Sequence, residues 1–235
     1  MKRTLTSLMA ASILAADGGA SVVTKRGAFI LFEGVDRCGK TTQASLLKEH
    51  LQKTQTVEQI RFPERFSAIG QLIDSYLQSS SNLNDQSIHL LFSANRWEQS
   101  DGIEAKLAAG CNLICDRYAY SGVAFTSAKG LDLEWCKNCD RGLPAPDCII
   151  YLDMPIEEAA KRGKFGEERY EKIDFQKKVR GQFLTLQAED TASGKIDWHV
   201  LNADQSVEDL HRDIVRVVDG VMEGVSKPVS KLWLE

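Results

Sequence analysis

Short apolar runs alternate along this chain with longer segments in which apolar residues recur at helical spacing. The apolar runs predict five strands, at residues 28–32, 57–61, 112–115, 148–152 and 198–201. The periodic segments predict helices at residues 41–53, 68–78, 85–109, 132–138, 156–161, 175–190 and 207–221. Strands that alternate with helices are typical of a parallel sheet with helices on both faces, so we predict an α/β fold.

Two segments that directly follow predicted strands carry polar residues. A Phe-Pro-Glu-Arg stretch occupies 62–65 after the second strand, and an Asp-Arg-Tyr stretch occupies 116–118 after the third. Ligands of open parallel sheets bind beyond the carboxyl ends of the strands. We therefore expect both segments to contribute to a binding site.

The stretch from Gly34 to Thr41 reads Gly-Val-Asp-Arg-Cys-Gly-Lys-Thr and fits the pattern G-x-x-x-x-G-K-[ST] between a predicted strand and a predicted helix. Its glycines allow a tight turn whose N–H groups converge on phosphate oxygens at the positive end of the helix, and Lys40 adds a positive charge. Thr41 offers a hydroxyl to Mg²⁺. The alternative is an ordinary glycine-rich turn before a Thr-capped helix, but the context favours a nucleoside triphosphate site.

Asp116 and Arg117 follow the apolar run of the third strand. A carboxylate at this position lies near the Mg²⁺ and the reacting phosphates of nucleotide-binding α/β proteins. Asp116 could instead, or in addition, cap a helix that begins near Tyr118. The planar guanidinium of Arg117 suits phosphate oxygens better than it suits a role as a solvated surface charge.

Phe92 and Arg96 lie four residues apart and therefore on one face of a predicted helix. An aromatic ring that stacks on a flat heterocycle and an arginine that hydrogen-bonds its edge would together hold a base. The alternative is an aromatic residue packed beside a solvated charge, which is common at this spacing. Further along, residues 161–171 mix glycines with basic residues between two predicted helices, which indicates a charged lid or a plain solvated loop.

Composition narrows the class of substrate. The 235 residues are 43% hydrophobic and 26% charged and include only five prolines, as expected of one compact domain. A net charge of −4 gives no overall attraction to nucleic acid or to an anionic membrane. We expect a small phosphorylated substrate, no nucleic acid partner and no membrane association.

Six cysteines are scattered along the chain, and several lie in apolar strand-like runs, which favours reduced thiols and a reducing compartment. Cys136-x-x-Cys139 has no second ligand pair at metal spacing, so we interpret it as part of a helix rather than as a zinc or redox site.

The first 24 residues are rich in Ala, Ser, Thr and Leu, begin with a basic pair and contain no acid before Asp17. Such a segment suits a secretory signal or a mitochondrial presequence. An ATP-using enzyme with free thiols is a poor candidate for secretion. We therefore expect a cytoplasmic or nuclear protein with a disordered tail, or a mitochondrial protein if the extension is a presequence.

Together these features resemble the eukaryotic thymidylate kinase family from about residue 26 to the C-terminus. The segments that carry the resemblance are FEGVDRCGKTTQ at 32–43, RFPER at 61–65, LLFSANRWE at 90–98, DRYAYSGVAF at 116–125, GLPAPD at 142–147 and ERYE at 168–171. The resemblance implies the fold of P-loop nucleoside monophosphate kinases, a five-stranded parallel sheet flanked by helices. It places a kinase domain at 25–235, with a short lid at about 162–171, after an N-terminal extension of residues 1–24.

The resemblance also implies the reaction and the assembly. The terminal phosphoryl group of ATP would be transferred to dTMP with Mg²⁺, giving ADP and dTDP for dTTP synthesis, and the enzyme would be a homodimer. The donor would be bound by Gly34, Gly39, Lys40, Thr41 and Thr42, with Arg162 and Arg169 closing over it and with Thr41 and Asp116 holding the metal. The catalytic group would be Asp36, Arg37, Lys40, Asp116 and Arg117, and the acceptor site would be Asp36, Phe62, Arg65, Phe92, Arg96, Arg117, Phe125 and Tyr170.

Within that site, the resemblance places Asp36 beside the sugar hydroxyl of the acceptor and Arg37 on the transferring phosphoryl group. Arg65 and Arg117 would grip the acceptor phosphate, while Phe92 and Arg96 would read thymine. Tyr170 and Phe125 would line the pocket around the sugar.

The chemistry of Arg96 predicts a base preference. A guanidinium only donates, so it satisfies the carbonyl at position four of thymine and uracil but faces an amino donor in cytosine. A buried donor that faces another donor costs about 1–3 kcal/mol. We therefore expect dTMP and dUMP to be preferred over dCMP.

Cys38 and the residues before Thr24 depart from the family pattern. A thiol near the positive end of a helix and beside Arg37 and Lys40 is either reactive or simply a tolerated small side chain. Three other functions compete with dTMP phosphorylation: a kinase for another nucleotide, a nucleotide-binding switch and an inactive scaffold. The base-reading segments disfavour the first, the lack of an Asn-Lys-x-Asp stretch disfavours the second, and retention of the catalytic group disfavours the third.

Overall fold

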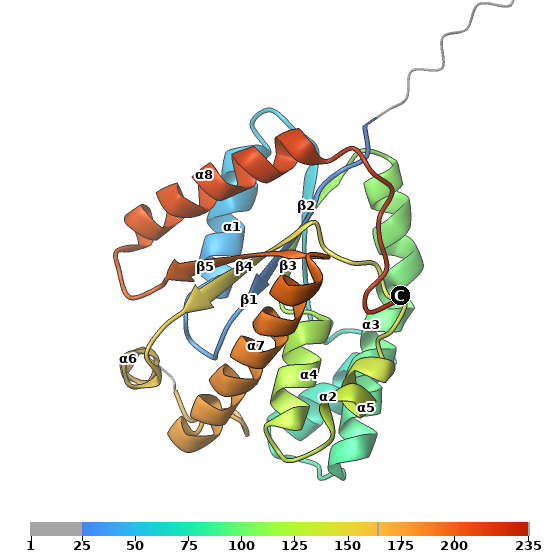
Figure 1. Ribbon diagram of the computed structural model, residues 1–235. Helices are drawn as coiled ribbons and strands as arrows, with labels where there is room; N and C mark the ends of the chain where they lie inside the picture. Colours follow the sequence, from blue (N-terminus) through green and yellow to red (C-terminus); the bar gives the residue numbers. More distant parts are fainter. Residues whose placement is uncertain (1–24, 164, 235) are drawn as a thin grey trace, which may run out of the picture.

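The computed structural model describes residues 25–163 and 165–234 (Figure 1). Its strands are β1 (Phe29–Glu33), β2 (Val57–Arg61), β3 (Asn112–Asp116), β4 (Cys148–Asp153) and β5 (Asp197–Asn202). Its helices are α1 (Lys40–Leu51), α2 (Ala68–Leu77), α3 (Asp85–Ala108), α4 (Ala119–Ser127), α5 (Leu133–Asn138), α6 (Ile156–Lys161), α7 (Ile173–Ser193) and α8 (Val207–Gly224). All five predicted strands and all seven predicted helices are confirmed, with small shifts at their ends. The predicted extension of residues 1–24 lies outside the described residues.

The five strands are parallel and follow the order β2-β3-β1-β4-β5. β1 lies in the middle, where Phe32 pairs with Asp116 of β3 and Glu33 pairs with Tyr151 of β4. Every residue of β1 and β3 is buried, because central strands of a parallel sheet are covered on both faces. The carboxyl ends of β1 and β3 therefore lie side by side, with Glu33 and Asp116 as their last residues.

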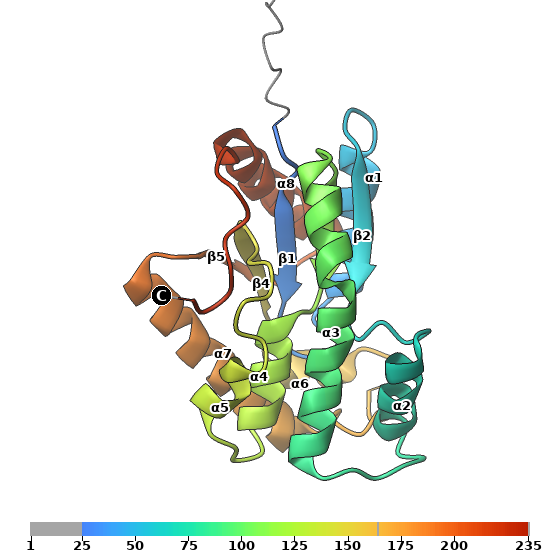
Figure 2. The ribbon, with the colours of Figure 1, turned by 90° about the vertical axis from the view of Figure 1, so that its right-hand side faces the viewer.

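Helices cover both faces of this sheet (Figure 2). α1 and α8 pack on one face around Ile30, Leu47 and Ile214. α3, α4 and α7 pack on the other face around Phe29 and Phe183. The chain thus leaves β1 through α1 to one face and leaves the neighbouring β3 through α4 to the other, which creates a switch point where ligands bind in open sheets.

α4 is the helix that the sequence did not predict. The segment Ala119–Ser127 contains a glycine, aromatic residues and β-branched residues, and nearly all of it is buried, so it shows neither high helix propensity nor an amphipathic period. Two N–H groups at its start, from Tyr118 (2.9 Å) and Ser121 (3.0 Å), donate to Oε1 of the buried Glu33. The alternative in which Asp116 caps this helix is therefore wrong.

The pair of cysteines at 136 and 139 lies in α5 and at its C-cap, which confirms the helical interpretation. Both thiols are free, and burial raises the pKa of Cys136 to about 12. Among the described helices, none combines the length and the apolar character that crossing a bilayer requires.

Candidate active site

A cavity of about 680 Å³ opens at the carboxyl ends of β1, β2 and β3. It gathers residues from the loop before α1, from α3 and α4, and from the lid segment at 162–171. The sequence-predicted residues that line it are Asp36, Arg37, Gly39, Lys40, Thr41, Thr42, Phe62, Arg65, Phe92, Arg96, Asp116, Arg117, Phe125, Arg162 and Tyr170. The predicted donor and acceptor groups therefore share one cavity.

The loop between β1 and α1 wraps around Lys40. The Lys40 ammonium is buried and donates to the carbonyl oxygens of Gly34 (3.1 Å) and Val35 (2.6 Å). Gly34 has a φ of 144°, and a Cβ there would lie 2.7 Å from the carbonyl oxygen of Leu152. Gly39, the N-cap of α1, has a φ of 103°. Both positions need glycine, and the resulting turn leaves the unpaired N–H groups of the first turn of α1 at the cavity.

Thr41 and Asp116 form a contact between α1 and the end of β3. Thr41 Oγ1 donates to Asp116 Oδ2 at 2.6 Å, and Arg61 Nε lies 3.6 Å from the same oxygen. Asp116 is 1% exposed, and its buried Oδ1 has no hydrogen-bond partner among the described atoms. A hydroxyl beside an unpartnered carboxylate oxygen offers hard ligands of the kind that Mg²⁺ accepts.

The described residues gather no cluster of three or more His, Cys, Asp or Glu side chains at ligand spacing. Mg²⁺ in phosphate-transferring sites needs only one or two carboxylates, because water and substrate phosphates supply the other ligands. The single carboxylate at Asp116 is therefore compatible with Mg²⁺.

The Asp36 carboxylate is held between two donors. Arg117 donates to Oδ1, and Gln176 Nε2 donates to Oδ2 at 2.6 Å. Gln176 Oε1 also accepts the Asp36 N–H at 2.9 Å. Burial opposes the charge on Arg117, but Asp36, Asp116 and Glu33 together raise the pKa of its guanidinium. Asp36 and Arg117 therefore border the cavity as a fixed, charged pair.

Arg37 connects the phosphate-binding loop to the lid segment. Its Nε donates to Glu171 Oε1 at 2.7 Å, and Glu171 Oε2 accepts the N–H groups of Gly166 (2.8 Å) and Glu167 (3.0 Å). Burial disfavours the charge on Glu171, but Arg37 and these N–H groups hold the pKa of the carboxyl below its usual range. Arg162 Nη1 donates to the Arg37 carbonyl oxygen at 3.1 Å. The phosphate-binding loop and the start of the lid segment therefore bring Arg37 and Arg162 together at the cavity.

Two further predicted arginines, Arg65 and Arg169, differ in where they lie. Arg65 lines the cavity and donates to Asp74 (2.5 Å) and Glu168 (2.9 Å). Arg169 instead donates from Nε to the Tyr76 carbonyl oxygen at 2.8 Å, and its guanidinium lies 4.1 Å above the Tyr76 ring. Because these contacts hold Arg169 at the end of α2, it does not line the cavity, and the expectation that it closes over the donor is not met here.

Arg96 is almost completely buried on α3. Its Nε and Nη2 donate to the two carboxylate oxygens of Asp140, at 3.1 and 2.5 Å. Arg96 is 2% exposed and Asp140 is fully buried, so the alternative of a solvated charge beside Phe92 is wrong. α4 approaches closely at Gly122, where a Cβ would lie 2.7 Å from Arg96 Nη2. The donors of Arg96 that Asp140 does not engage remain available to the cavity.

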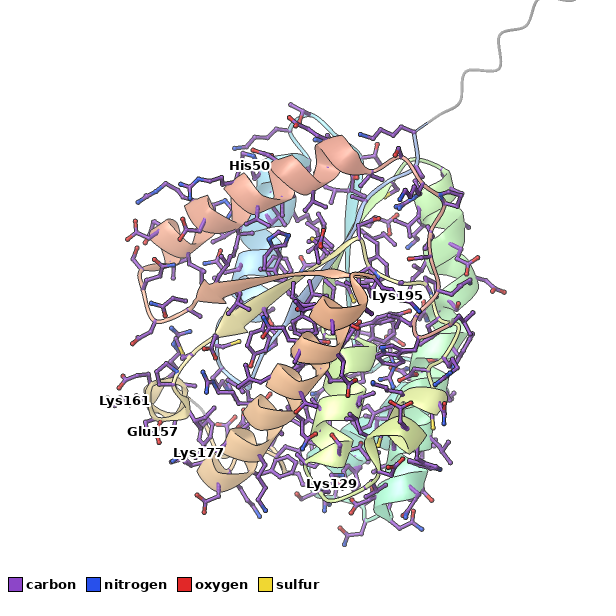
Figure 3. All side chains as sticks on the ribbon, in the orientation of Figure 1. His50, Lys129, Glu157, Lys161, Lys177 and Lys195 are labelled. Atoms are coloured by element: carbon purple, nitrogen blue, oxygen red, sulfur yellow. The ribbon has the colours of Figure 1, made fainter. Side chains whose placement is uncertain are left out.

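Aromatic side chains form the wall near α4 and α7. The Tyr170 ring stacks on Phe175 at 5.3 Å and lies 5.7 Å from Phe125. Tyr170 Oη accepts from Lys129 Nζ at 2.8 Å, and Lys129 is labelled near the far end of α4 in Figure 3. Phe62 is buried at the end of β2. These rings provide the flat, apolar surface that a nucleoside needs.

Residues 32–214 match the profile of the family described as thymidylate kinase. The chain belongs to the thymidylate kinase family. It is 46% identical to human thymidylate kinase over 215 residues, which cover 90% of this chain and 100% of the human protein. It is 51% identical to the Schizosaccharomyces pombe thymidylate kinase over 197 residues, which cover 83% of this chain and 93% of that protein.

A solved structure of thymidylate kinase from Candida albicans has the same fold, with a TM-score of 0.80 and 36% identity over 88% of this chain and 98% of the other. These similarities confirm the predicted fold of P-loop nucleoside monophosphate kinases and the predicted enzyme class.

Four buried polar residues that support this site were not predicted: Glu33, Asp140, Glu171 and Gln176. Glu33 ends a strand directly before the phosphate-binding loop, and that position could have drawn attention to it. The other three contact residues that are distant in the sequence, so no local pattern identifies them.

Cys38, where this chain departs from the family pattern, is completely buried. Its Sγ lies 3.4 Å from Lys40 Nζ, and it packs in the core with Val35. A thiol without exposed surface is not accessible to alkylating reagents. The structure therefore favours the tolerated small side chain over the reactive thiol.

Proposed function

We propose that this protein transfers the terminal phosphoryl group of ATP to dTMP. The observation that carries the proposal is that residues of the phosphate-binding loop line the same cavity as Phe92 and Arg96. In the reaction, an oxygen of the dTMP phosphate forms a bond to the terminal phosphorus of ATP. The bond from that phosphorus to the β–γ bridging oxygen breaks, and ADP leaves.

Catalysis in this site would consist of alignment and neutralisation of charge, because phosphoryl transfer leaves the protein little covalent work. Lys40 would exchange its loop carbonyls for donor phosphates. Arg37 and Arg162, which meet at the loop, would neutralise the transferring group. Arg65 and Arg117, which also line the cavity, would hold the acceptor phosphate.

Mg²⁺ would be held by the Thr41 hydroxyl and the Asp116 carboxylate. The unpartnered Asp116 Oδ1 and the adjacent hydroxyl support this assignment. When bound, the ion neutralises charge on the donor phosphates. The remaining residues of the loop orient those phosphates through N–H groups at the start of α1.

The sugar of dTMP would lie between Asp36 and Tyr170. Asp36 is fixed by Arg117 and Gln176, so its carboxylate is oriented to accept a hydrogen bond from a sugar hydroxyl. Thymine would stack on Phe92 and receive a hydrogen bond from Arg96. This arrangement favours dTMP and dUMP over dCMP, because Arg96 has no acceptor for an amino group.

The kinase domain would span residues 25–235, with the lid at about 162–171, of which Lys164 lies outside the described residues. The base of the lid is anchored where α6 meets α7: Glu157 and Lys177, labelled close together in Figure 3, form an ion pair of 2.7 Å. We assign the protein to the cytoplasm or nucleus, or to the mitochondrion if residues 1–24 act as a presequence. Import of a fluorescent fusion of those residues into mitochondria tests the second location.

We also propose a homodimer that associates through α2 and α3. Phe66, directly before α2, is 91% exposed, Leu72 on α2 is 56% exposed, and Leu90 and Trp97 are 51% and 41% exposed on one face of α3. Exposed apolar groups on adjacent helices are typical of an association surface. Sedimentation analysis should give twice the mass of the chain, and Leu90→Lys should shift the protein toward the monomer. A wild-type monomer at micromolar concentration would refute the homodimer.

The function is tested by incubating the purified protein with ATP, Mg²⁺ and each deoxynucleoside monophosphate in turn while ADP release is followed. We expect strong turnover with dTMP, little turnover with purine or cytidine nucleotides, and loss of turnover in Arg37→Ala. ADP release at the same rate without an acceptor would identify a hydrolase or switch instead. Strong turnover with a different monophosphate would identify a kinase for another nucleotide.

A further inference from the structure

A buried histidine lies directly behind the base end of the cavity. His89 on α3 is fully buried, and its Nδ1 lies 2.8 Å from Oγ1 of Thr126 on α4. Its Nε2 lies 3.0 Å from the carbonyl oxygen of Cys136 on α5. Thr126 lines the cavity, whereas His89 does not. The hydrogen bond to Thr126 therefore connects His89 to the site.

The partners of His89 define which ring nitrogen carries the proton. A carbonyl oxygen only accepts, so the Cys136 carbonyl assigns the hydrogen to Nε2. Burial and the positive charge of Arg96 lower the pKa of His89, so the ring is neutral at pH 7 and its Nδ1 is an acceptor. The Thr126 hydroxyl must then donate its one hydrogen to Nδ1. The Thr126 oxygen can therefore only accept a hydrogen bond from a ligand, through its lone pairs.

Thr126 lies on the face of α4 that approaches Arg96, and both residues line the cavity. Gly122 and Thr126 lie one turn apart on the same face of α4, and Gly122 is the position where α4 approaches the Arg96 guanidinium. This end of the cavity therefore presents a donor beside an acceptor. Thymine carries the complementary edge, a carbonyl at position four beside the N3–H, and cytosine reverses both groups.

We propose that His89 is a positioning residue that fixes the Thr126 hydroxyl as a hydrogen-bond acceptor for the N3–H of the thymine base. The inference rests on the proposed dTMP kinase function and adds a second group to base recognition, because Arg96 alone reads only the carbonyl. It also explains why a histidine is buried between three helices with both ring nitrogens engaged.

The test compares dTMP with 5-methyl-dCMP, which keeps the methyl group of thymine and reverses only the hydrogen-bonding edge. Thr126→Val removes the hydroxyl at nearly constant shape. His89→Gln keeps a donor for the Cys136 carbonyl but removes the ring Nδ1 acceptor that faces Thr126. The matched control is Ser127→Ala, which removes a buried hydroxyl from the same helix that donates to the Val123 carbonyl at 2.8 Å.

In Thr126→Val, kcat/KM for dTMP should fall about tenfold, the size of one neutral hydrogen bond, mainly through KM. kcat/KM for 5-methyl-dCMP should not fall, because the substitution removes the Thr126 hydroxyl, an acceptor that would face another acceptor, N3 of 5-methylcytosine. His89→Gln should raise kcat/KM for 5-methyl-dCMP, because the freed hydroxyl rotates and donates. The double variant should show the same dTMP to 5-methyl-dCMP ratio as Thr126→Val alone. Ser127→Ala should keep the wild-type ratio.

Two results would overturn the inference. One is an unchanged ratio of kcat/KM for dTMP to kcat/KM for 5-methyl-dCMP in Thr126→Val. The other is a double variant in which the effects of the two substitutions on this ratio add. Nitrogen NMR of the wild-type protein gives a test that needs no variant: the His89 ring should be neutral with its proton on Nε2, and a proton on Nδ1 would overturn the assignment. The proposed function fails separately, if the wild-type protein does not phosphorylate dTMP at all. Wild-type turnover of dTMP with unaltered ratios in the variants would leave the function intact and reject only the role of His89.

Discussion

The buried ion pair between Arg96 and Asp140 allows stability and base recognition to be separated. Both side chains are essentially inaccessible, and they share two hydrogen bonds. Removing one partner of such a pair leaves an uncompensated buried charge, which costs about 3–5 kcal/mol. Since a domain has about 5–15 kcal/mol of stability in total, Asp140→Leu should lose a large part of it.

Replacing both partners has a different expected effect. The variant Arg96→Met with Asp140→Leu contains no buried charge, and substitutions of this kind are often neutral or stabilising. The double variant should therefore recover most of the free energy of unfolding that Asp140→Leu loses. It should not recover thymine binding, because the guanidinium is absent. Loss of a hydrogen bond from a charged donor costs about 1.5–3 kcal/mol, so kcat/KM for dTMP should remain about 10- to 150-fold below that of the wild type.

The assay is urea unfolding at pH 7 for the wild type, Asp140→Leu and the double variant, combined with steady-state kinetics for dTMP and for ATP. KM for ATP should change little in the double variant, since Arg96 belongs to the proposed acceptor site and not to the proposed donor site. A cost below about 1 kcal/mol for Asp140→Leu would show that the pair is not a closed, desolvated unit. Wild-type kcat/KM for dTMP in the double variant would refute the role of Arg96 in reading the base.

Three further predictions concern other contacts of the site. Gly122→Ala places a Cβ 2.7 Å from Arg96 Nη2, so KM for dTMP should rise while KM for ATP stays constant. Steady-state kinetics measure both constants, and an unchanged KM for dTMP would contradict the close approach. Glu171→Gln removes the charge that orients Arg37, so kcat should fall about 10- to 100-fold. A coupled assay of ADP release measures kcat, and wild-type activity of the variant would contradict the orienting role of Glu171. His89 has a pKa below its usual 6.5, so the unfolded chain binds more protons, and the free energy of unfolding should decline as pH falls from 6.5 toward the pKa in the folded state. Urea unfolding at several pH values should show a smaller decline in His89→Gln, and equal slopes in the two proteins would contradict the shift.

Part of the fold was predictable because β1, β3 and β4 are short, buried apolar runs and because α2 and α8 each carry a clear apolar period. The phosphate-binding loop was predictable because its chemistry needs a fixed local spacing of Gly, Lys and Thr. α4 was not, because a helix buried on nearly all sides shows no contrast between polar and apolar faces. Its start is stabilised by Glu33, which is 85 residues from Tyr118 in the sequence.

Some residues of the site were likewise predictable from the sequence, and others were not. Phe92 and Arg96 share a helix, so their spacing identified them together. The contacts that orient the site residues join distant segments: Arg37 meets Glu171 at a separation of 134 residues, and Arg96 meets Asp140 at a separation of 44. Arg169 shows what the sequence leaves open. The composition of the lid indicated only a charged segment, and the resemblance implied that Arg169 closes over the donor, but which charges point into the cavity depends on how the segment packs against α2.

The central claim is that one cavity binds ATP and dTMP together and passes a phosphoryl group between them. Incubation with ATP labelled on the terminal phosphate, dTMP and Mg²⁺, followed by separation of the nucleotides, tests this claim most directly. We predict that the label appears in dTDP in the same molar amount as ADP. Label found in inorganic phosphate, with no labelled dTDP, would contradict the account.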